Sequence, residues 1–119
     1  VPPWDRGPPP AIDGRVRRAI AAMREDPAAG ARMDKIARNA GLSRAHFFRL
    51  FERTTGVTPH VFLNVLRVEQ AVDLVAGSTA PLAEIGGTLG FDSPAHFSRF
   101  FRDHVSVAPR AFRTVLHAT

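Results

Sequence analysis

The chain has 119 residues, 45% of them hydrophobic, and a formal net charge of +5 that falls entirely in residues 1–58, where 11 Lys or Arg face 6 Asp or Glu. A chain of this length can bury one hydrophobic core. The absence of cysteine excludes a disulfide framework and a thiolate metal site. No apolar run approaches the roughly 18 residues that a membrane span needs. We therefore expect a soluble, cytoplasmic domain whose basic first half suits a polyanionic partner, although an Arg-rich sequence is also compatible with a plain solvated surface.

Residues 1–11 are expected to form a linker or arm. The opening VPPWDRGPPP includes five prolines and a glycine, a composition that does not form a helix. Because the chain begins with valine rather than methionine, we expect an effector or dimerisation domain upstream of it in the parent protein.

Residues 12–57 are predicted to form a first subdomain of three helices. Apolar residues at helical spacing predict helices over 12–25, 33–40 and 44–55, and a glycine follows the second and the third. Ser43 is placed to cap the third helix. The inward face of the first is expected to consist of Ile12, Val16, Ile20 and Met23.

A long helix is predicted to connect this subdomain to a second one, residues 78–119. Thr58 and Pro59 indicate a helix start, because a capping hydroxyl is followed by proline at the first helical position. The predicted helix extends from Pro59 to Ala76 and lies within a connecting segment, residues 58–77. At about 1.5 Å per residue it spans roughly 27 Å, against about 34 Å between successive major-groove faces on one side of DNA. Further helices are predicted over 82–89, 94–104 and 109–116.

The second subdomain repeats the first. The offset is 49 residues up to the turn and 50 after it, with one extra residue around Asp92. Each copy predicts two helices joined by a tight, glycine-containing turn, so the fold class is all-α: two helix-turn-helix subdomains joined by a long central helix, about seven helices in all. The repeat pairs Ile36, Gly41, Leu42, Ser43, Ala45, His46, Phe47, Arg49, Phe51, Pro59 and Phe62 with Ile85, Gly90, Phe91, Ser93, Ala95, His96, Phe97, Arg99, Phe101, Pro109 and Phe112.

The motifs of both copies resemble those of the AraC/XylS family of bacterial transcription regulators. The first copy contains G-L-S at 41–43, R-L-F at 49–51, T-G-V-T-P at 55–59 and L-R-V at 66–68. The resemblance covers about residues 12–113, and it implies a seven-helix DNA-binding domain that contacts adjacent major-groove segments and usually activates transcription. The second copy carries the family signature at Ile85, Gly90, Phe91, Ser93, His96, Phe97, Ser98, Arg99, Phe101, Pro109, Phe112 and Arg113.

The outward faces of helices 44–55 and 94–104 carry the candidate DNA contacts. Arg49 and its repeat partner Arg99 are the candidate base readers, because a guanidinium can donate two hydrogen bonds to guanine O6 and N7; both could instead cover apolar surface with their stems. Phe48 could contact a thymine methyl or belong to the core. The resemblance implies base and phosphate contacts at Ser43, Arg44, Ala45, His46, Phe48, Arg49, Arg53, Ser93, Ala95, His96, Ser98, Arg99 and Arg102.

The remaining arginines are assigned simpler roles. Arg44, Arg53 and Arg102 suit contacts to phosphate or solvent better than contacts to bases. Arg67 and Arg113 could be structural, paired with acids or helix ends where the two subdomains meet.

No metal, cofactor or catalytic site is expected. His46 and His96 are one repeat apart, on different subdomains, and no cysteine or tight carboxylate spacing accompanies them. We interpret them as polar anchors, to phosphate or backbone, near the start of each recognition helix. The sequence has no nucleophile elbow, phosphate loop or paired carboxylates, so we predict that the protein is not an enzyme.

These features predict a sequence-specific, double-stranded DNA-binding domain of a transcription regulator, an activator by resemblance, with RNA polymerase as a partner. The competing hypothesis is a helix-turn-helix interaction module that docks on RNA polymerase or on a partner regulator without reading bases. The neutral second half and the alanines at Ala45 and Ala95 are compatible with that alternative.

Three residues of the second copy depart from the family pattern. Gly86 and Gly87 fall inside a predicted helix, where each glycine costs up to about 1 kcal/mol. Ser106 replaces the turn glycine that the first copy keeps as Gly56, which is unfavourable if the position needs a positive φ. We therefore expect the second subdomain to be the less stable one.

Overall fold

The computed structural model describes residues 12–26, 28 and 32–118, so the arm predicted for 1–11 lies outside the described residues. This part of the chain is all-α and contains no strand. The all-α prediction and the predicted order of helices are confirmed, with ends shifted by one or two residues. The helices are α1 (Gly14–Glu25), α2 (Met33–Asn39), α3 (Arg44–Thr55), α4 (Pro59–Gly77), α5 (Leu82–Thr88), α6 (Pro94–Val105) and α7 (Pro109–Leu116).

The start of α1 corrects the sequence prediction. The Asp13 carboxylate accepts hydrogen bonds from the Arg15 backbone N–H at 2.8 Å and from the Arg15 Nε at 3.2 Å, so the helix begins at Gly14. The Arg15 side chain and backbone hydrogen bonds lower the pKa of Asp13 to about 2. Ile12 precedes this cap and is 42% exposed, so its predicted place on the buried face of α1 is wrong.

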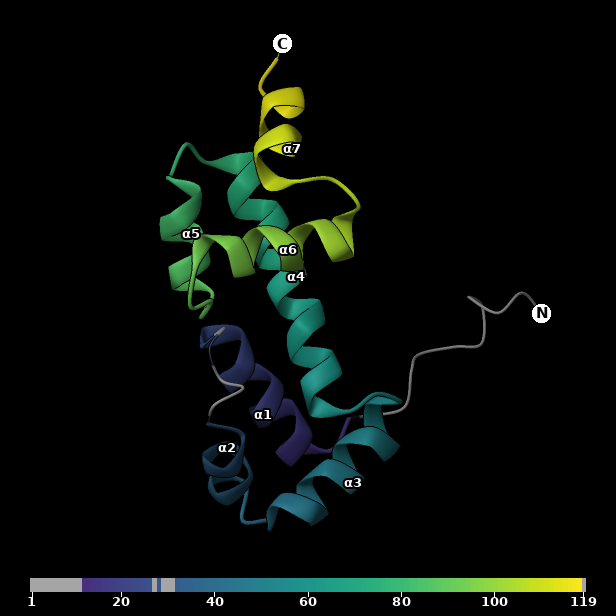
Figure 1. Cartoon of the computed structure of the whole chain (residues 1–119). Coiled ribbons are helices and arrows are strands. Elements are labelled where there is room, and N and C mark those ends of the chain that lie inside the picture. The colour runs from purple at the N-terminus through teal and green to yellow at the C-terminus, as the bar shows by residue number, and fades with distance from the viewer. Residues whose placement is uncertain (1–11, 27, 29–31, 119) are drawn as a thin grey trace, which may run out of the picture.

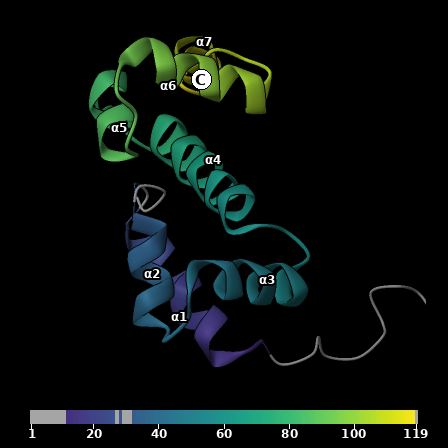
Figure 2. The same cartoon turned by 60° about the horizontal axis from the view of Figure 1, so that its bottom comes forward.

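Helix α4 runs through the middle of the molecule, with α1–α3 around one end and α5–α7 around the other (Figures 1 and 2). Its first half supplies Leu63 and Leu66 to the first core, and its second half supplies Ala71 and Val75 to the second. Each is at most 2% exposed. One helix therefore carries both cores and fixes the position of one subdomain relative to the other.

The two cores repeat the same aromatic packing. Phe51 of α3 meets Phe62 of α4 edge to face with ring centroids 5.5 Å apart, and Phe101 of α6 meets Phe112 of α7 at the same 5.5 Å. Such edge-to-face pairs are worth about 0.5–1.5 kcal/mol beyond the burial of their area. The internal sequence repeat is thus a repeat of packing as well.

Two arginines link α4 to other parts of the chain, Arg113 within the second subdomain and Arg67 where the two subdomains meet. Arg113 of α7 donates from Nε to the Val75 carbonyl in the last turn of α4 at 3.1 Å, which satisfies a carbonyl group at that helix end. Its Nη1 donates to the Ala80 carbonyl, in the connection between α4 and α5, at 2.7 Å. The predicted pairing of Arg113 with a helix end is confirmed, but its predicted place where the two subdomains meet is wrong, because both of its partners lie within the second subdomain. Arg67 of α4 lies over the Phe91 ring at 5.5 Å, and burial lowers the pKa of its guanidinium while the nearby Asp26 opposes that shift.

The turn after α5 touches the first subdomain directly. Gly90 has φ +88°, and a Cβ built on it would lie 2.9 Å from the Cβ of Ala28. Both the left-handed backbone and this close approach require glycine there. The contact joins the two subdomains at a point away from the axis of α4.

Gly86 has a packing role that the sequence did not reveal. A Cβ at this position would lie 2.9 Å from the Cβ of Phe97, so α5 and α6 approach closely only because residue 86 lacks a side chain. The cost in helix propensity expected for Gly86 is therefore offset by packing against Phe97. A Cβ built on Gly87 would have no neighbour within 4 Å. Glycine at this position therefore costs helix stability without any packing contact that offsets the cost.

We predict opposite effects for alanine at these two adjacent positions. Gly86→Ala should lower the free energy of unfolding by about 1–3 kcal/mol, because the added methyl overpacks the α5–α6 contact. Gly87→Ala should raise it by up to about 1 kcal/mol through helix propensity alone. Urea unfolding of the two variants beside the wild type measures both; the same sign of change for the pair would contradict the packing role of Gly86.

Ser106 provides a second stability prediction. It occupies the left-handed region with φ +72°, as Gly56 does with φ +84°, so the predicted requirement for a positive φ is confirmed. Ser106→Gly should therefore stabilise the protein by about 1 kcal/mol, and Gly56→Ser should destabilise it by a similar amount. Thermal unfolding checks the pair, and a Ser106→Gly variant no more stable than the wild type would refute the strain at Ser106.

Candidate nucleic-acid interface

Helices α3 and α6 are built alike. Each has 12 residues, and each is capped by a serine whose Oγ accepts a hydrogen bond from the backbone N–H of a histidine, His46 for Ser43 at 3.2 Å and His96 for Ser93 at 3.1 Å. Figures 1 and 2 both show the two helices running in the same direction, one in each subdomain. The second helix of each predicted helix-turn-helix is thus presented with the same polarity.

The buried aromatic residues orient both helices. Phe47 and Phe51 of α3, and Phe97 and Phe101 of α6, are at most 1% exposed and anchor one face of each helix in its core. The opposite face is left to solvent. Its exposed members among the predicted contact residues are Ser43, Arg44, Ala45, His46, Arg49 and Arg53 on the first subdomain and Ser93, Ala95, His96, Arg99 and Arg102 on the second.

Phe48 and Ser98 differ from this pattern because both are half-buried. Phe48 packs against the first core, its ring 5.9 Å from that of Phe47. The guanidinium of Arg44 lies 4.6 Å above the Phe48 ring, a cation–π distance. Of the two roles predicted for Phe48, the structure favours core packing.

Arg44 is held in place by its neighbours. Its Nη1 donates to the Asp34 carboxylate of α2 at 2.7 Å, and its Nη2 lies 3.4 Å from Nε2 of His60 at the start of α4. His60 was not among the predicted site residues, because nothing in its local sequence indicates a partner 16 positions away. The first residue of α3 is therefore tied to both flanking helices.

Arg49 and Arg99 differ from Arg44 because neither has a hydrogen-bond or ion-pair partner among residues 12–26, 28 and 32–118. Both are exposed, and neither guanidinium makes a hydrogen bond or ion pair within the described part of the chain. An exposed, unpaired guanidinium is available for a bidentate acceptor such as a guanine edge or a phosphate. The equivalent positions of α3 and α6 thus present the same unpaired donor.

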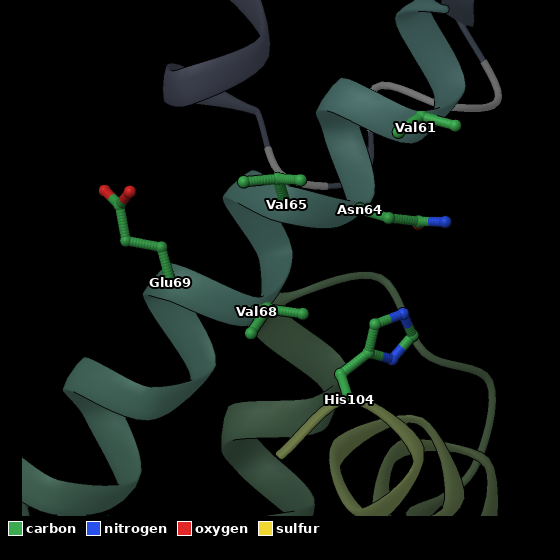
Figure 3. Close-up of a pocket in the computed structure, with 6 residues that line it drawn as sticks. All are labelled: Val61, Asn64, Val65, Val68, Glu69 and His104. Carbon is green, nitrogen blue, oxygen red and sulfur yellow. The ribbon is translucent and has the colours of Figure 1, made fainter. Parts of the chain in front are cut away.

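A shallow, mostly apolar groove lies along α4 (Figure 3). It is lined by Val61, Asn64, Val65, Val68 and Glu69 of α4 and by His104 of α6. Val61 and Val65 are 49% and 56% exposed there, and His104 of α6 borders it with Nδ1 donating to the Phe100 carbonyl at 2.9 Å. Its one carboxylate, Glu69, faces Arg24 at 3.5 Å. The groove lining does not place a nucleophile beside a base.

Within the described residues, no group of three His, Cys, Asp or Glu side chains could hold a metal ion. No helix in this part of the chain is long and apolar enough to cross a membrane.

Comparison with known proteins agrees with this architecture. Residues 36–114 match a family model described as a helix-turn-helix domain. The transcriptional activator RhaS of Escherichia coli is 36% identical over 80 residues, which cover 67% of this chain and 29% of RhaS. The chain spans about a third of the length of the curated relatives it matches.

Two solved structures extend the likeness to three dimensions. An AraC-type transcriptional regulator from Chromobacterium violaceum superposes with a TM-score of 0.76 at 29% identity, covering 87% of this chain and 92% of that one. The DNA-binding domain of the global transcriptional factor AdpA, solved in complex with a target DNA, superposes with a TM-score of 0.79 at 29% identity, covering 89% and 96%.

The fold, the paired helices α3 and α6 and the relatives together define the class: a helix-turn-helix DNA-binding domain of a transcription regulator. The chain belongs to the AraC/XylS family, as its two signature motifs indicate. This membership favours a DNA-binding domain over the interaction module considered from the sequence.

The serine caps offer a test of how the recognition helices are anchored. Ser43→Ala and Ser93→Ala should each lower the free energy of unfolding by about 1 kcal/mol, because each leaves a backbone N–H without its acceptor. Amide exchange followed by NMR should speed up at His46 in the first variant and at His96 in the second. Unchanged exchange at both amides would contradict the capping roles.

Proposed function

We propose that the chain binds double-stranded DNA sequence-specifically by inserting α3 and α6 into consecutive major-groove segments. The observation that carries this proposal is a pair of exposed arginines, Arg49 and Arg99, at equivalent positions on two capped helices of the same polarity. Neither is paired with another side chain in the part of the chain that the structure describes. The relative AdpA, whose DNA-binding domain was solved with a target DNA, supports the same use of the fold.

Within this proposal the contact residues divide into two groups. Arg49 and Arg99 read guanine edges, with Ala45, Ala95 and Ser98 beside them on the face that enters the groove. A second group positions the helices on phosphates, and half or more of protein–DNA hydrogen bonds are of this kind. It consists of Ser43, Arg44, His46, Arg53, Ser93, His96 and Arg102.

The charge distribution supports a strong electrostatic contribution to affinity. The whole net charge of +5 lies in residues 1–58, so the first subdomain supplies most of the attraction to phosphate. Binding that releases condensed counterions weakens as salt rises, with a slope set by the number of phosphates neutralised. We expect affinity to fall steeply between low and physiological salt.

The proposal extends to the whole regulator. The name of RhaS describes a transcriptional activator, and we propose that this domain likewise activates transcription through contact with RNA polymerase. The curated relatives are about three times as long as the matched region, which supports an effector-binding or dimerisation region elsewhere in the parent protein. The domain itself acts within the cytoplasm.

The role of Arg49 can be tested directly. Arg49→Ala should weaken binding to a selected DNA site by about 1–3 kcal/mol and relax the preference at one base pair, because the lost contact is a bidentate one to a base edge. Fluorescence anisotropy with the selected duplex and with all single-base variants of it measures both effects.

Arg24→Ala is the matched control, since it removes one exposed positive charge outside both recognition helices. It should weaken binding to every duplex equally or leave it unchanged. If Arg49→Ala behaves like this control, Arg49 is a phosphate contact; if the wild-type chain binds all duplexes equally well, the proposed sequence-specific function is refuted.

A further inference from the structure

We infer that the DNA site is an imperfect direct repeat: two boxes about one helical turn apart that share a guanine on the same strand, read by Arg49 in one box and by Arg99 in the other. This inference rests on the proposed function and specifies its target. Three independent observations support it: the side chains of the two exposed faces, their anchoring, and the polarity of the helices.

The exposed faces of α3 and α6 carry the same side chains near the start of each helix, the part proposed to enter the major groove. Ala45, His46 and Arg49 recur as Ala95, His96 and Arg99, all exposed. Residues i and i+4 lie on the same side of a helix, so each arginine projects beside a small alanine that leaves room for a base edge. Equal side chains at equal positions read equal base edges.

The two arginines are also held in equivalent frames. The caps Ser43 and Ser93 fix the first turn, and both helices end in a residue with a left-handed backbone conformation. Behind them, the Phe47 and Phe51 rings are 5.7 Å apart and the Phe97 and Phe101 rings 6.0 Å apart. The helix positions that carry Arg49 and Arg99 are therefore anchored in the same way in the two subdomains.

The polarity of the helices selects a direct repeat over an inverted one. Both views show α3 and α6 running in the same direction on either side of the middle of α4. Parallel helices present equivalent side chains to the same strand, whereas a twofold-related pair would present them to opposite strands of a palindrome. The two boxes of the DNA site are therefore repeated in the same orientation, without inversion.

The repeat is imperfect because flanking positions differ. Arg44, held by Asp34 and stacked on Phe48, is replaced in α6 by Pro94, and the half-buried Phe48 is replaced by Ser98. Further along, Glu52 and Arg53 correspond to Arg102 and Asp103, so the two charges exchange order. These differences act outside the shared guanine and make one box distinguishable from the other.

The test is selection of the 119-residue chain on a random double-stranded DNA library at near-physiological salt, followed by sequencing. We expect an enriched site with guanine at corresponding places of two boxes, on one strand, about 10–10.5 base pairs apart. In parallel selections, Arg49→Ala should lose the guanine preference in one box and Arg99→Ala in the other, each by at least about fivefold. Arg24→Ala should keep both preferences, and circular dichroism confirms that each variant is folded.

The outcomes separate this inference from the proposed function. Two boxes without a common base, boxes in inverted orientation, or a single box would overturn the direct repeat while sequence-specific binding stands. Loss of both guanines on changing either arginine alone would overturn the assignment of one arginine to each box. Absence of any enriched site would refute the proposed function and the direct repeat with it.

Discussion

The sharing of α4 between two hydrophobic cores is the constraint on which the rest of this structure depends. Leu63 and Leu66 are buried among α1–α3, and Ala71 and Val75 among α5–α7. Neither subdomain has a full core without its half of this helix, because each consists of three helices too short to enclose one alone. Packing against one rigid helix couples the positions of α3 and α6. The contact of Gly90 with Ala28 and the half-buried Arg67 secure that arrangement from the side.

In each subdomain the second helix of the helix-turn-helix has an inner face fixed by phenylalanine and an outer face exposed to solvent. The edge-to-face pairs Phe51–Phe62 and Phe101–Phe112 have the same 5.5 Å spacing, so the inner scaffold is nearly duplicated. The described residues bury no charged side chain completely: Arg67 and Arg113 are half-buried, and the arginines on the outer faces of α3 and α6 are exposed. The energetic division is therefore simple: apolar packing holds the recognition helices in place, and exposed guanidinium groups remain available to a polyanion.

Most of the helices were predictable because their ends are chemically marked. Ser43, Thr58 and Gly56 are caps whose geometry follows from local chemistry, and the structure places each at a helix terminus. Ile12 was misplaced because periodicity continued past the Asp13 cap. The role of Gly86 could not be predicted, since it depends on Phe97, which lies 11 positions away on another helix. The same limit applies to the candidate site: its exposed residues follow from helical phase, whereas the tether of Arg44 to Asp34 and His60 is a tertiary contact with no sequence signal.

The length of α4 restricts how proteins of this architecture can diverge. One residue inserted between Leu66 and Ala71 would turn the second subdomain by about 100° around the helix axis and move it by about 1.5 Å. That rotation would direct the exposed face of α6 away from the side of the molecule on which α3 is exposed. Seven inserted residues make nearly two whole turns and leave only about 20° of misalignment, although they also lengthen the helix by about 10 Å. Surface loops can drift in length one residue at a time, whereas this helix can change only in steps that restore its phase.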